Sequence, residues 1–265
     1  SGTQNIKLGT SGGQQTANAL STISNQTVDI GIAGGTQVAN ALVSTGGQTL
    51  RVGVSSSTQA ANVLYSSGVQ NVRLVTTTGD QTVDSMIASS GTQTANVLYA
   101  TGDQTLALGR TAADQTLTAF TATSDQTATA LTAGATLTAN ILYSADDQTL
   151  NLGRTATDLT ANVLNSGATQ ALDIARATTT LTANAFTAGT DQTLVLATAG
   201  ADLTANALSA VSDATLTIGR TGATLTATVL RSGDDQTLTL AVSDQNLTAN
   251  AFYSTDDQAL NLGRT

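Results

Sequence analysis

The stretch 159–186 reads LTANVLNSGATQALDIARATTTLTANAF and contains LTAN twice, at 159–162 and at 181–184. The second copy begins twenty-two positions after the first. A fixed interval of this kind is typical of a repeat protein, in which each unit stacks on the one before it. The same interval extends outward from this stretch through the rest of the chain.

The Asn of LTAN recurs along the whole sequence, with Thr118 and Thr228 filling two gaps. Successive members keep the interval of the opening stretch, except for one longer step between Asn62 and Asn96. The positions are Asn18, Asn40, Asn62, Asn96, Asn140, Asn162, Asn184, Asn206 and Asn250.

A shorter period, half the length of the first, lies beneath it. Gln recurs at every eleventh position from Gln4 to Gln81 and resumes at Gln93 after one extra residue; from Leu137 onward, Leu alternates with Gln at this place, apart from one Ala. The chain is therefore a series of twenty-four units of eleven positions with a single inserted residue. Positions one to eleven below count from the Gln or Leu that opens each unit.

The units come in two types. Type A is represented by QTLNLGRTATD from Gln148, and type B by LTANVLNSGAT from Leu159. The two types alternate, except that the units opening at Gln81 and Gln93 are both B-like. A phase slip therefore lies near 81–93, beside the inserted residue.

Hydrophobic residues alternate with polar ones in type A, where positions three and five are apolar. This period of two indicates strands with one buried face. In type B we expect the large apolar residue at position six to point inward and position seven to point outward. The predicted core includes Leu150, Leu152, Leu164, Leu172, Ile174, Phe186, Leu208, Leu230 and Phe252.

A unit of this length allows a strand of about six residues and a tight turn. Two units then form one coil, and the sequence predicts an all-β fold, a parallel β-solenoid of about 12 two-sided coils, each of about 22 residues. Residues 1–265 form a single continuous solenoid in this interpretation. The Asn residues are predicted to form an interior or corner ladder, each amide bonding its neighbours above and below. An exposed ligand-binding row is the alternative.

The composition speaks against catalysis. The chain has no His, Cys, Trp or Pro, a single Lys, and only Asp among its 18 acidic residues. Without His, Cys or a second Lys, the usual general bases and nucleophiles are missing, so we predict a protein that is not an enzyme and has no cofactor.

Asp often ends a unit, and three doublets are candidates for weak Ca²⁺ ligands because hard cations prefer carboxylate oxygens. Turn capping and solubility are the alternative explanation. The doublets are Asp146 with Asp147, Asp234 with Asp235, and Asp256 with Asp257.

Three further rows share a position from unit to unit. Arg residues at position seven of type A could bind anionic glycans, but we expect them to neutralise nearby Asp. They are Arg110, Arg154, Arg176, Arg220 and Arg264. Tyr65, Tyr99, Tyr143 and Tyr253 share position seven of type B and could mark a lateral or adhesive stripe, with ordinary exposed aromatic residues as the alternative.

The third row is Thr at position two, which resembles the ice-binding faces of solenoid antifreeze proteins. An ice-binding face also needs a uniform next outward position, which type A lacks.

The net charge of −9 argues against nucleic acid as a partner, and no apolar run is long enough to predict membrane insertion. The sequence shows no capping segment, so we expect the last coil to add onto the first coil of another molecule. The main predicted partner is therefore a second copy of the chain in a head-to-tail homopolymer, with surface polysaccharide as a candidate second partner.

The long strand–turn–strand period and the Gln and Asn rows resemble curlin-type functional amyloids of bacterial surfaces. The resemblance is architectural, because the curlin pattern of Gln-x-Gly followed by Asn-x-Ala is absent. The Thr- and Ala-rich composition also resembles the repeat proteins that anchor bacterial holdfasts. These resemblances imply a secreted structural protein at the cell surface, forming an extracellular fibre for adhesion or biofilm scaffolding. A repeat segment of a larger adhesin or phage fibre is the alternative, and an ice-binding solenoid is the third.

Overall fold

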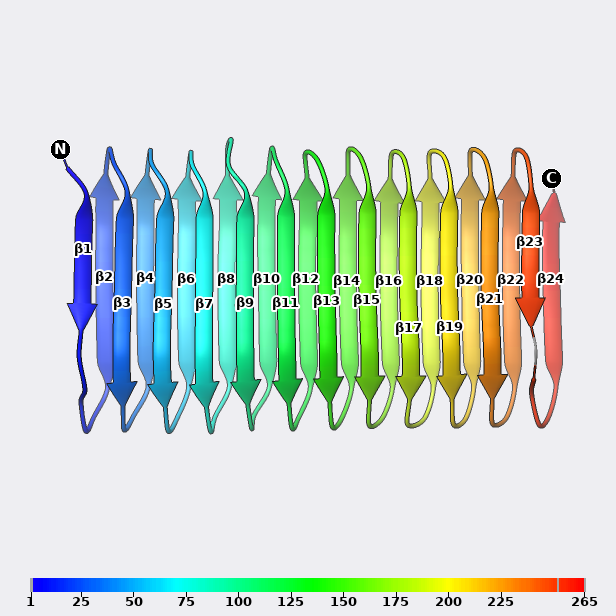
Figure 1. Ribbon diagram of the computed structural model, residues 1–265, viewed down its shortest axis with the longest axis horizontal. Helices are drawn as coiled ribbons and strands as arrows, with labels where there is room; N and C mark the ends of the chain where they lie inside the picture. The colour runs from blue at the N-terminus through cyan, green and yellow to red at the C-terminus, as the bar shows by residue number, and fades with distance from the viewer. Residues whose placement is uncertain (1, 252, 265) are drawn as a thin grey trace.

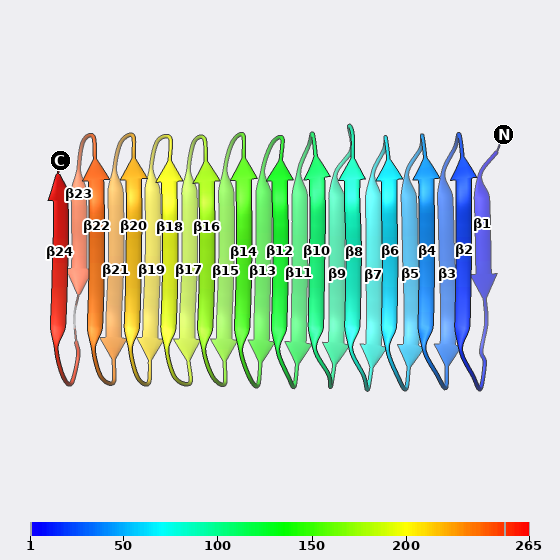
Figure 2. The ribbon, with the colours of Figure 1, turned by 180° about the vertical axis from the view of Figure 1, so that it is seen from behind.

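The computed structural model describes residues 2–251 and 253–264 and confirms an all-β parallel solenoid. Two parallel sheets of 12 strands each lie face to face (Figures 1 and 2). Strands run across the long axis, and the described chain begins at one end of the rod and finishes at the other. One coil is an odd-numbered strand plus the even-numbered strand that follows it, so coil one is β1 and β2.

The odd-numbered strands form the sheet that faces the viewer in Figure 1. Most strands are longer than the sequence predicts, as β3 and β14 illustrate with eight residues each. The strands are β1 (Gln4–Leu8), β3 (Gln26–Ala33), β5 (Gln48–Ser55), β7 (Gln70–Thr77), β9 (Gln93–Ala100), β11 (Gln115–Ala122), β13 (Leu137–Ser144), β15 (Leu159–Ser166), β17 (Leu181–Ala188), β19 (Leu203–Ala210), β21 (Leu225–Ser232) and β23 (Leu247–Ala251).

The even-numbered strands form the sheet that faces the viewer in Figure 2. They are β2 (Gln15–Thr22), β4 (Gln37–Ser44), β6 (Gln59–Ser66), β8 (Gln81–Ala88), β10 (Gln104–Thr111), β12 (Gln126–Ala133), β14 (Gln148–Thr155), β16 (Gln170–Ala177), β18 (Gln192–Ala199), β20 (Ala214–Thr221), β22 (Gln236–Ser243) and β24 (Gln258–Arg264).

Four positions of each unit face the interior: one, three, five and eight. Positions one to five alternate inside and outside, as the pleat of a strand requires. In β9 and β10, whose side chains are described throughout, the alternation breaks at position six: positions six and seven are not buried and position eight is buried again. This break lengthens the strand and lets it reach the turn with a small inward residue, Ala, Ser or Thr.

The core is built from positions three and five. Leu150, Leu152, Leu172 and Ile174 are buried there. Position six behaves differently from our expectation at Leu98, which is half-buried and lies on the outer side of β9. Of the other predicted core residues, the side chains of Leu164, Phe186, Leu208 and Leu230 and the whole of Phe252 lie outside the described residues.

Position one contributes buried Gln side chains that bond to one another through the coils. In the even-numbered sheet, Gln37 Nε2 donates to Gln15 Oε1 at 3.2 Å, and Gln59 Nε2 donates to Gln37 Oε1 at 3.0 Å. This ladder continues to Gln192, and a second ladder in the odd-numbered sheet runs from Gln4 to Gln115. Each amide thus satisfies a buried polar group that would otherwise cost about 1–3 kcal/mol.

Both ladders end where the next coil places an apolar residue at position one. Gln115 pairs with Leu137, and Gln192 pairs with Ala214. The Oε1 atoms of Gln115 and Gln192 are the buried side-chain polar atoms left without a hydrogen-bond partner in the described part of the chain. The ladder resumes beyond Ala214, where Gln258 Nε2 donates to Gln236 Oε1 at 3.4 Å.

Ala214→Gln should stabilise the fold, because the new amide would stand between Gln192 and Gln236 and bond to both. Satisfying the buried Oε1 of Gln192 should raise the free energy of unfolding by about 1–2 kcal/mol. Thermal unfolding followed by circular dichroism measures the change.

Leu137→Gln is the matched control. It also meets an orphaned Oε1, that of Gln115, but it leaves its own Oε1 facing Leu159 and removes a buried Leu. This variant should unfold at a lower temperature than the parent. An Ala214→Gln variant that is no more stable than the parent would contradict the ladder explanation.

Candidate functional site: the faces and edges of the solenoid

Position four of type B carries the Asn ladder. Asn162 Nδ2 donates to Asn140 Oδ1 at 2.9 Å, and Asn184 Nδ2 donates to Asn162 Oδ1 at 2.8 Å. The same bond joins Asn206 to Asn184 and, in the first coils, Asn62 to Asn40. The structure therefore contains a ladder of hydrogen-bonded amides with one Asn in each participating coil.

The ladder lies on the outer surface of the sheet and not in the interior or at a corner. Asn40, Asn62, Asn96, Asn140, Asn162, Asn184 and Asn206 are half-buried, and Asn18 and Asn250 are exposed. The reason is the pleat: positions one, three and five face inward, so position four must face outward. Sequence periodicity alone shows that the Asn residues stack, and it leaves the face open.

The phase slip moves type B from one sheet to the other. Asn18, Asn40 and Asn62 lie on β2, β4 and β6, whereas the later members lie on odd-numbered strands from β9 onward. The inserted residue lengthens the turn between β8 and β9 and leaves the pairing in register, with Gln70 opposite Gln93. Each sheet therefore changes its surface chemistry between coils four and five.

Beyond the slip, the odd-numbered sheet presents two regular polar columns, which we call the Thr/Asn face. Position two supplies Thr94, Thr116, Thr138, Thr160, Thr182, Thr204, Thr226 and Thr248. Position four supplies Asn96, Thr118, Asn140, Asn162, Asn184, Asn206, Thr228 and Asn250. Every outward residue at these two positions of β9–β23 is Thr or Asn, so this surface is uniform.

One edge of the rod is acidic. The turns that follow the odd-numbered strands lie along the lower edge in Figures 1 and 2, and they carry most of the Asp residues. We call this row the acidic edge. It comprises Asp80, Asp103, Asp125, Asp146, Asp147, Asp191, Asp213, Asp234, Asp235, Asp256 and Asp257.

Where position eleven is Asp, its carboxylate joins one coil to the next. The Oδ1 of Asp213 accepts the backbone N–H of Asp235 at 3.2 Å, and the Oδ1 of Asp235 accepts the N–H of Asp257 at 3.2 Å. The sequence predicts turn capping at this position; the carboxylate does cap backbone, but that of the following coil. The backbone N–H groups at these turn positions thus find their acceptors in the stacked coil.

The Ca²⁺ candidates all lie on the acidic edge. Asp146 and Asp147 are separated from the other two doublets by three coils, because Ala168, Thr190 and Ser212 occupy the same turn position between them. Asp234 and Asp256 fall in neighbouring coils, as do Asp235 and Asp257. Within residues 2–251 and 253–264, no group of three or more metal-ligating side chains comes together.

The opposite edge carries fewer acids, and Asp158 there has an unusual environment. Thr179 Oγ1–H donates to Asp158 Oδ1, and the backbone N–H of Thr180 donates to the same atom at 3.2 Å. The Thr179 hydroxyl, followed by the Thr180 N–H, lowers the pKa of Asp158 below its ordinary value of 3.8 because both donors favour the charged carboxylate.

The Arg row lies on the even-numbered strands beyond the slip. Arg110, Arg154, Arg176 and Arg220 are exposed, and the side chain of Arg264 lies outside the described residues. Arg220 Nη2 lies 3.9 Å from Asp244 Oδ2, as expected, but Arg110, Arg154 and Arg176 form no ion pair with a described residue.

The four Tyr residues do not form one stripe. Tyr65 belongs to β6 in the even-numbered sheet, whereas Tyr99 and Tyr143 belong to β9 and β13 in the odd-numbered sheet. Tyr253 follows β23 and lies under the guanidinium of Arg231, whose carbon is 6.0 Å from the ring centre. The phase slip separates residues that share a unit position, which the repeat alignment does not show.

Position four of type A varies so much along the sequence that sequence analysis missed a stack of mostly basic residues there. In coils one to four this position of the odd-numbered sheet holds Lys7, Asp29, Arg51 and Arg73 in succession. Arg51 Nη1 lies 3.4 Å from Asp29 Oδ1, and Arg73 stands directly above Arg51 in the pairing register. The separation of the two Arg residues by one full repeat was the available signal in the sequence.

Asn162→Ala should weaken the solenoid, because Asn162 bonds to Asn140 below and to Asn184 above. We expect a loss of about 1 kcal/mol in the free energy of unfolding, measured by denaturant titration. Asn162→Thr is the matched control and should cost less, since Thr already occupies this column at Thr118 and Thr228. An Asn162→Ala variant as stable as the parent would show that the amide ladder contributes nothing.

Comparisons of the chain with protein-family models, with curated proteins and with solved structures find no match. Within residues 2–251 and 253–264 there is no helix of the length and hydrophobicity that crossing a membrane requires.

Proposed function

We propose that this chain is a structural protein that stacks end to end with further copies into an extracellular, amyloid-like fibre. The observation that carries the proposal is the state of the last described coil. Leu260 and Leu262 at positions three and five of β24 are each 52% exposed, whereas Leu238 and Leu240 at the same positions of β22 are each 1% exposed. A further coil would bury Leu260 and Leu262, just as the last coil buries Leu238 and Leu240.

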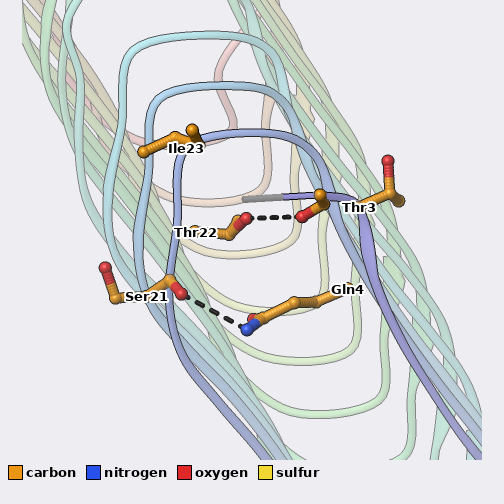
Figure 3. Close-up of a pocket in the computed structure, with 6 residues that line it drawn as sticks. Thr3, Gln4, Ser21, Thr22 and Ile23 are labelled. Carbon is orange, nitrogen blue, oxygen red and sulfur yellow. Dashed lines mark hydrogen bonds between the residues drawn. The ribbon is translucent and has the colours of Figure 1, made fainter.

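The other end of the rod is open in the same way. Gly2, Thr3, Gln4, Ser21, Thr22 and Ile23 line a hollow at the end of coil one (Figure 3). Gln4 Nε2 donates to the Ser21 carbonyl at 3.3 Å, and Thr22 Oγ1 donates to the Gly2 carbonyl at 2.8 Å. In later coils the corresponding side faces the preceding coil. Strand β1 also presents an unpaired edge, which is a template for a parallel strand of another molecule.

The charge distribution favours opposite ends meeting. Residues 1–91 carry three basic and three acidic side chains and are neutral overall, whereas residues 92–265 carry six Arg and fifteen Asp, which is the whole net charge of −9. Two acidic ends repel each other, so a filament in which every acidic end meets a neutral end avoids the acidic–acidic contacts that a filament of alternating molecules would contain.

The role of the fibre follows from its build. A rod with long repeating surfaces suits adhesion or a biofilm scaffold, and the resemblance to curlin-type architecture favours placement outside the cell. Surface polysaccharide is the partner that such a scaffold would meet. In the alternative, the solenoid is a segment of a larger adhesin or phage fibre, and neighbouring coils of that protein cover the same two ends.

Electron microscopy of the purified chain tests the stacking proposal. We expect long unbranched filaments with a meridional reflection at about 4.7–4.8 Å, the spacing of stacked strands. Leu260→Asp combined with Leu262→Asp should abolish the filaments, because two charges would be buried at each junction. Asn261→Asp is the matched control: it adds an Asp on the outward side of the same strand and should leave the filaments intact.

Two results would overturn end-to-end stacking. One is a parent chain that stays as discrete rods of about 55–60 Å at high concentration, which would favour the segment of a larger fibre. The other is filaments that persist in the double Asp variant.

Ice binding is a second candidate. An ice-binding face needs two uniform outward positions, and the Thr/Asn face has them because it consists of type B units alone beyond the slip. The columns at positions two and four run unbroken from β9 to β23. If this face binds ice, the parent chain should inhibit ice recrystallisation and Thr160→Lys with Thr182→Lys should lose the effect. Thr215→Lys with Thr237→Lys places the same charges on the even-numbered sheet and should retain it. Equal activity in both variants would exclude the Thr/Asn face.

A further inference from the structure

The odd-numbered sheet carries a concentration of positive charge in coils one to four, which we call the basic patch. It comprises Lys7, Arg51 and Arg73 at position four of β1, β5 and β7. All three side chains are exposed, with 61% of the Arg51 side chain accessible. Asp29 lies between Lys7 and Arg51 and neutralises one of the three charges.

The two Arg residues lie one above the other on adjacent coils. Like charges that stand directly opposite each other in a sheet destabilise it unless a counter-charge is present. Asp29 supplies that charge for Arg51, but the neighbour of Arg73 on its other side is the neutral Asn96. The Arg73 guanidinium makes no ion pair with any described residue. The basic patch therefore retains positive charge that an external anion can neutralise.

The acidic edge offers anions in the matching arrangement. Asp191, Asp213, Asp235 and Asp257 occupy the same turn position in four successive coils. Their described contacts as acceptors use Oδ1, which takes the backbone N–H of the coil above. The other carboxylate oxygen of each Asp is thus available to a guanidinium, and a guanidinium fork can hold two such oxygens.

The distance between Arg51 and Arg73 favours one class of anionic partner over others. Arg51 and Arg73 are one coil apart, as are successive Asp residues of the acidic edge, so both rows repeat at about 4.8 Å. A DNA strand carries one phosphate for about every 3.4 Å of helix axis and winds around that axis, and like-facing side chains of an extended peptide repeat at about 6.6–6.8 Å. A row of carboxylates on stacked strands has the same spacing as Arg51 and Arg73 on their two adjacent coils, and the other two polyanions do not.

We propose that the basic patch of one molecule docks on the acidic edge of a second copy, so that rods or fibres associate side by side. Residues 1–91 of the first molecule, which are neutral overall, then lie against residues 92–265 of the second, which are acidic. The two rods are therefore staggered along their axes. This lateral contact is independent of end-to-end stacking, because it uses position four and the turns, whereas stacking uses the open ends of coils one and twelve.

Sedimentation equilibrium tests the contact in the Leu260→Asp, Leu262→Asp background, where end stacking is blocked. We expect the average mass to exceed that of one chain at about 10 mM ionic strength and to fall to it at about 1 M, because the Debye length shrinks from about 30 to about 3 Å. Arg51→Gln with Arg73→Gln should weaken association about tenfold.

Arg154→Gln with Arg176→Gln is the matched control, since these two Arg residues also stand on adjacent coils, on the even-numbered sheet. It removes the same charge and should leave association unchanged. A salt-insensitive mass, a single-chain mass at low salt, or equal weakening by the two pairs would each overturn the proposal. Circular dichroism of every variant establishes that the solenoid is intact.

A charge exchange gives an independent readout. One chain carries Arg51→Asp with Arg73→Asp, and a second carries Asp213→Arg with Asp235→Arg. Neither chain should associate with itself through this contact, but a mixture should, because each altered surface is complementary to a surface of the other chain. Failure of the mixture to associate, with both chains folded, would reject the proposed pairing.

Discussion

The hydrogen bond between one coil and the next is the interaction on which the rest of the structure depends. A single coil leaves its strand backbones, the Oε1 atoms of its buried Gln residues and many of its turn N–H groups without partners. The neighbouring coil supplies them, as when Gln59 donates to Gln37 and Asp235 receives the N–H of Asp257. Hydrogen bonding therefore requires the long repeat of the sequence. Each coil must present to the following coil the same donors and acceptors that the preceding coil presents to it.

Much of the fold could be predicted because a strand leaves a period-two pattern and stacking leaves a longer one. Leu150 and Leu152 illustrate the first, and the regular return of Asn140, Asn162 and Asn184 illustrates the second. What the pattern cannot give is the break in alternation at position six, which depends on where the strand bends toward the turn. Leu98 lies on the outer side for this reason, and the small residues at position eight lie inside.

The surfaces were less predictable than the core, because unit position and sheet are separate variables. Tyr65 and Tyr99 share a unit position but lie on opposite sheets, since two B-like units follow each other at the slip. Arg51 and Arg73 look like scatter at a tolerant position when units are aligned, yet they form a stacked pair in space. Residues at one unit position lie on the same face only where their units belong to the same sheet.

The Gln ladders also give the rod a direction. In each described bond the later coil donates its Nε2 to the Oε1 of the earlier one, from Gln26 and Gln4 up to Gln258 and Gln236. Amide dipoles therefore point the same way along the axis, as peptide dipoles do in a helix. Two molecules joined through their last coils would set the carbonyl oxygen of one Gln258 against that of the other. Any assembly that continues the ladder is thus polar, with unlike ends that can grow at different rates.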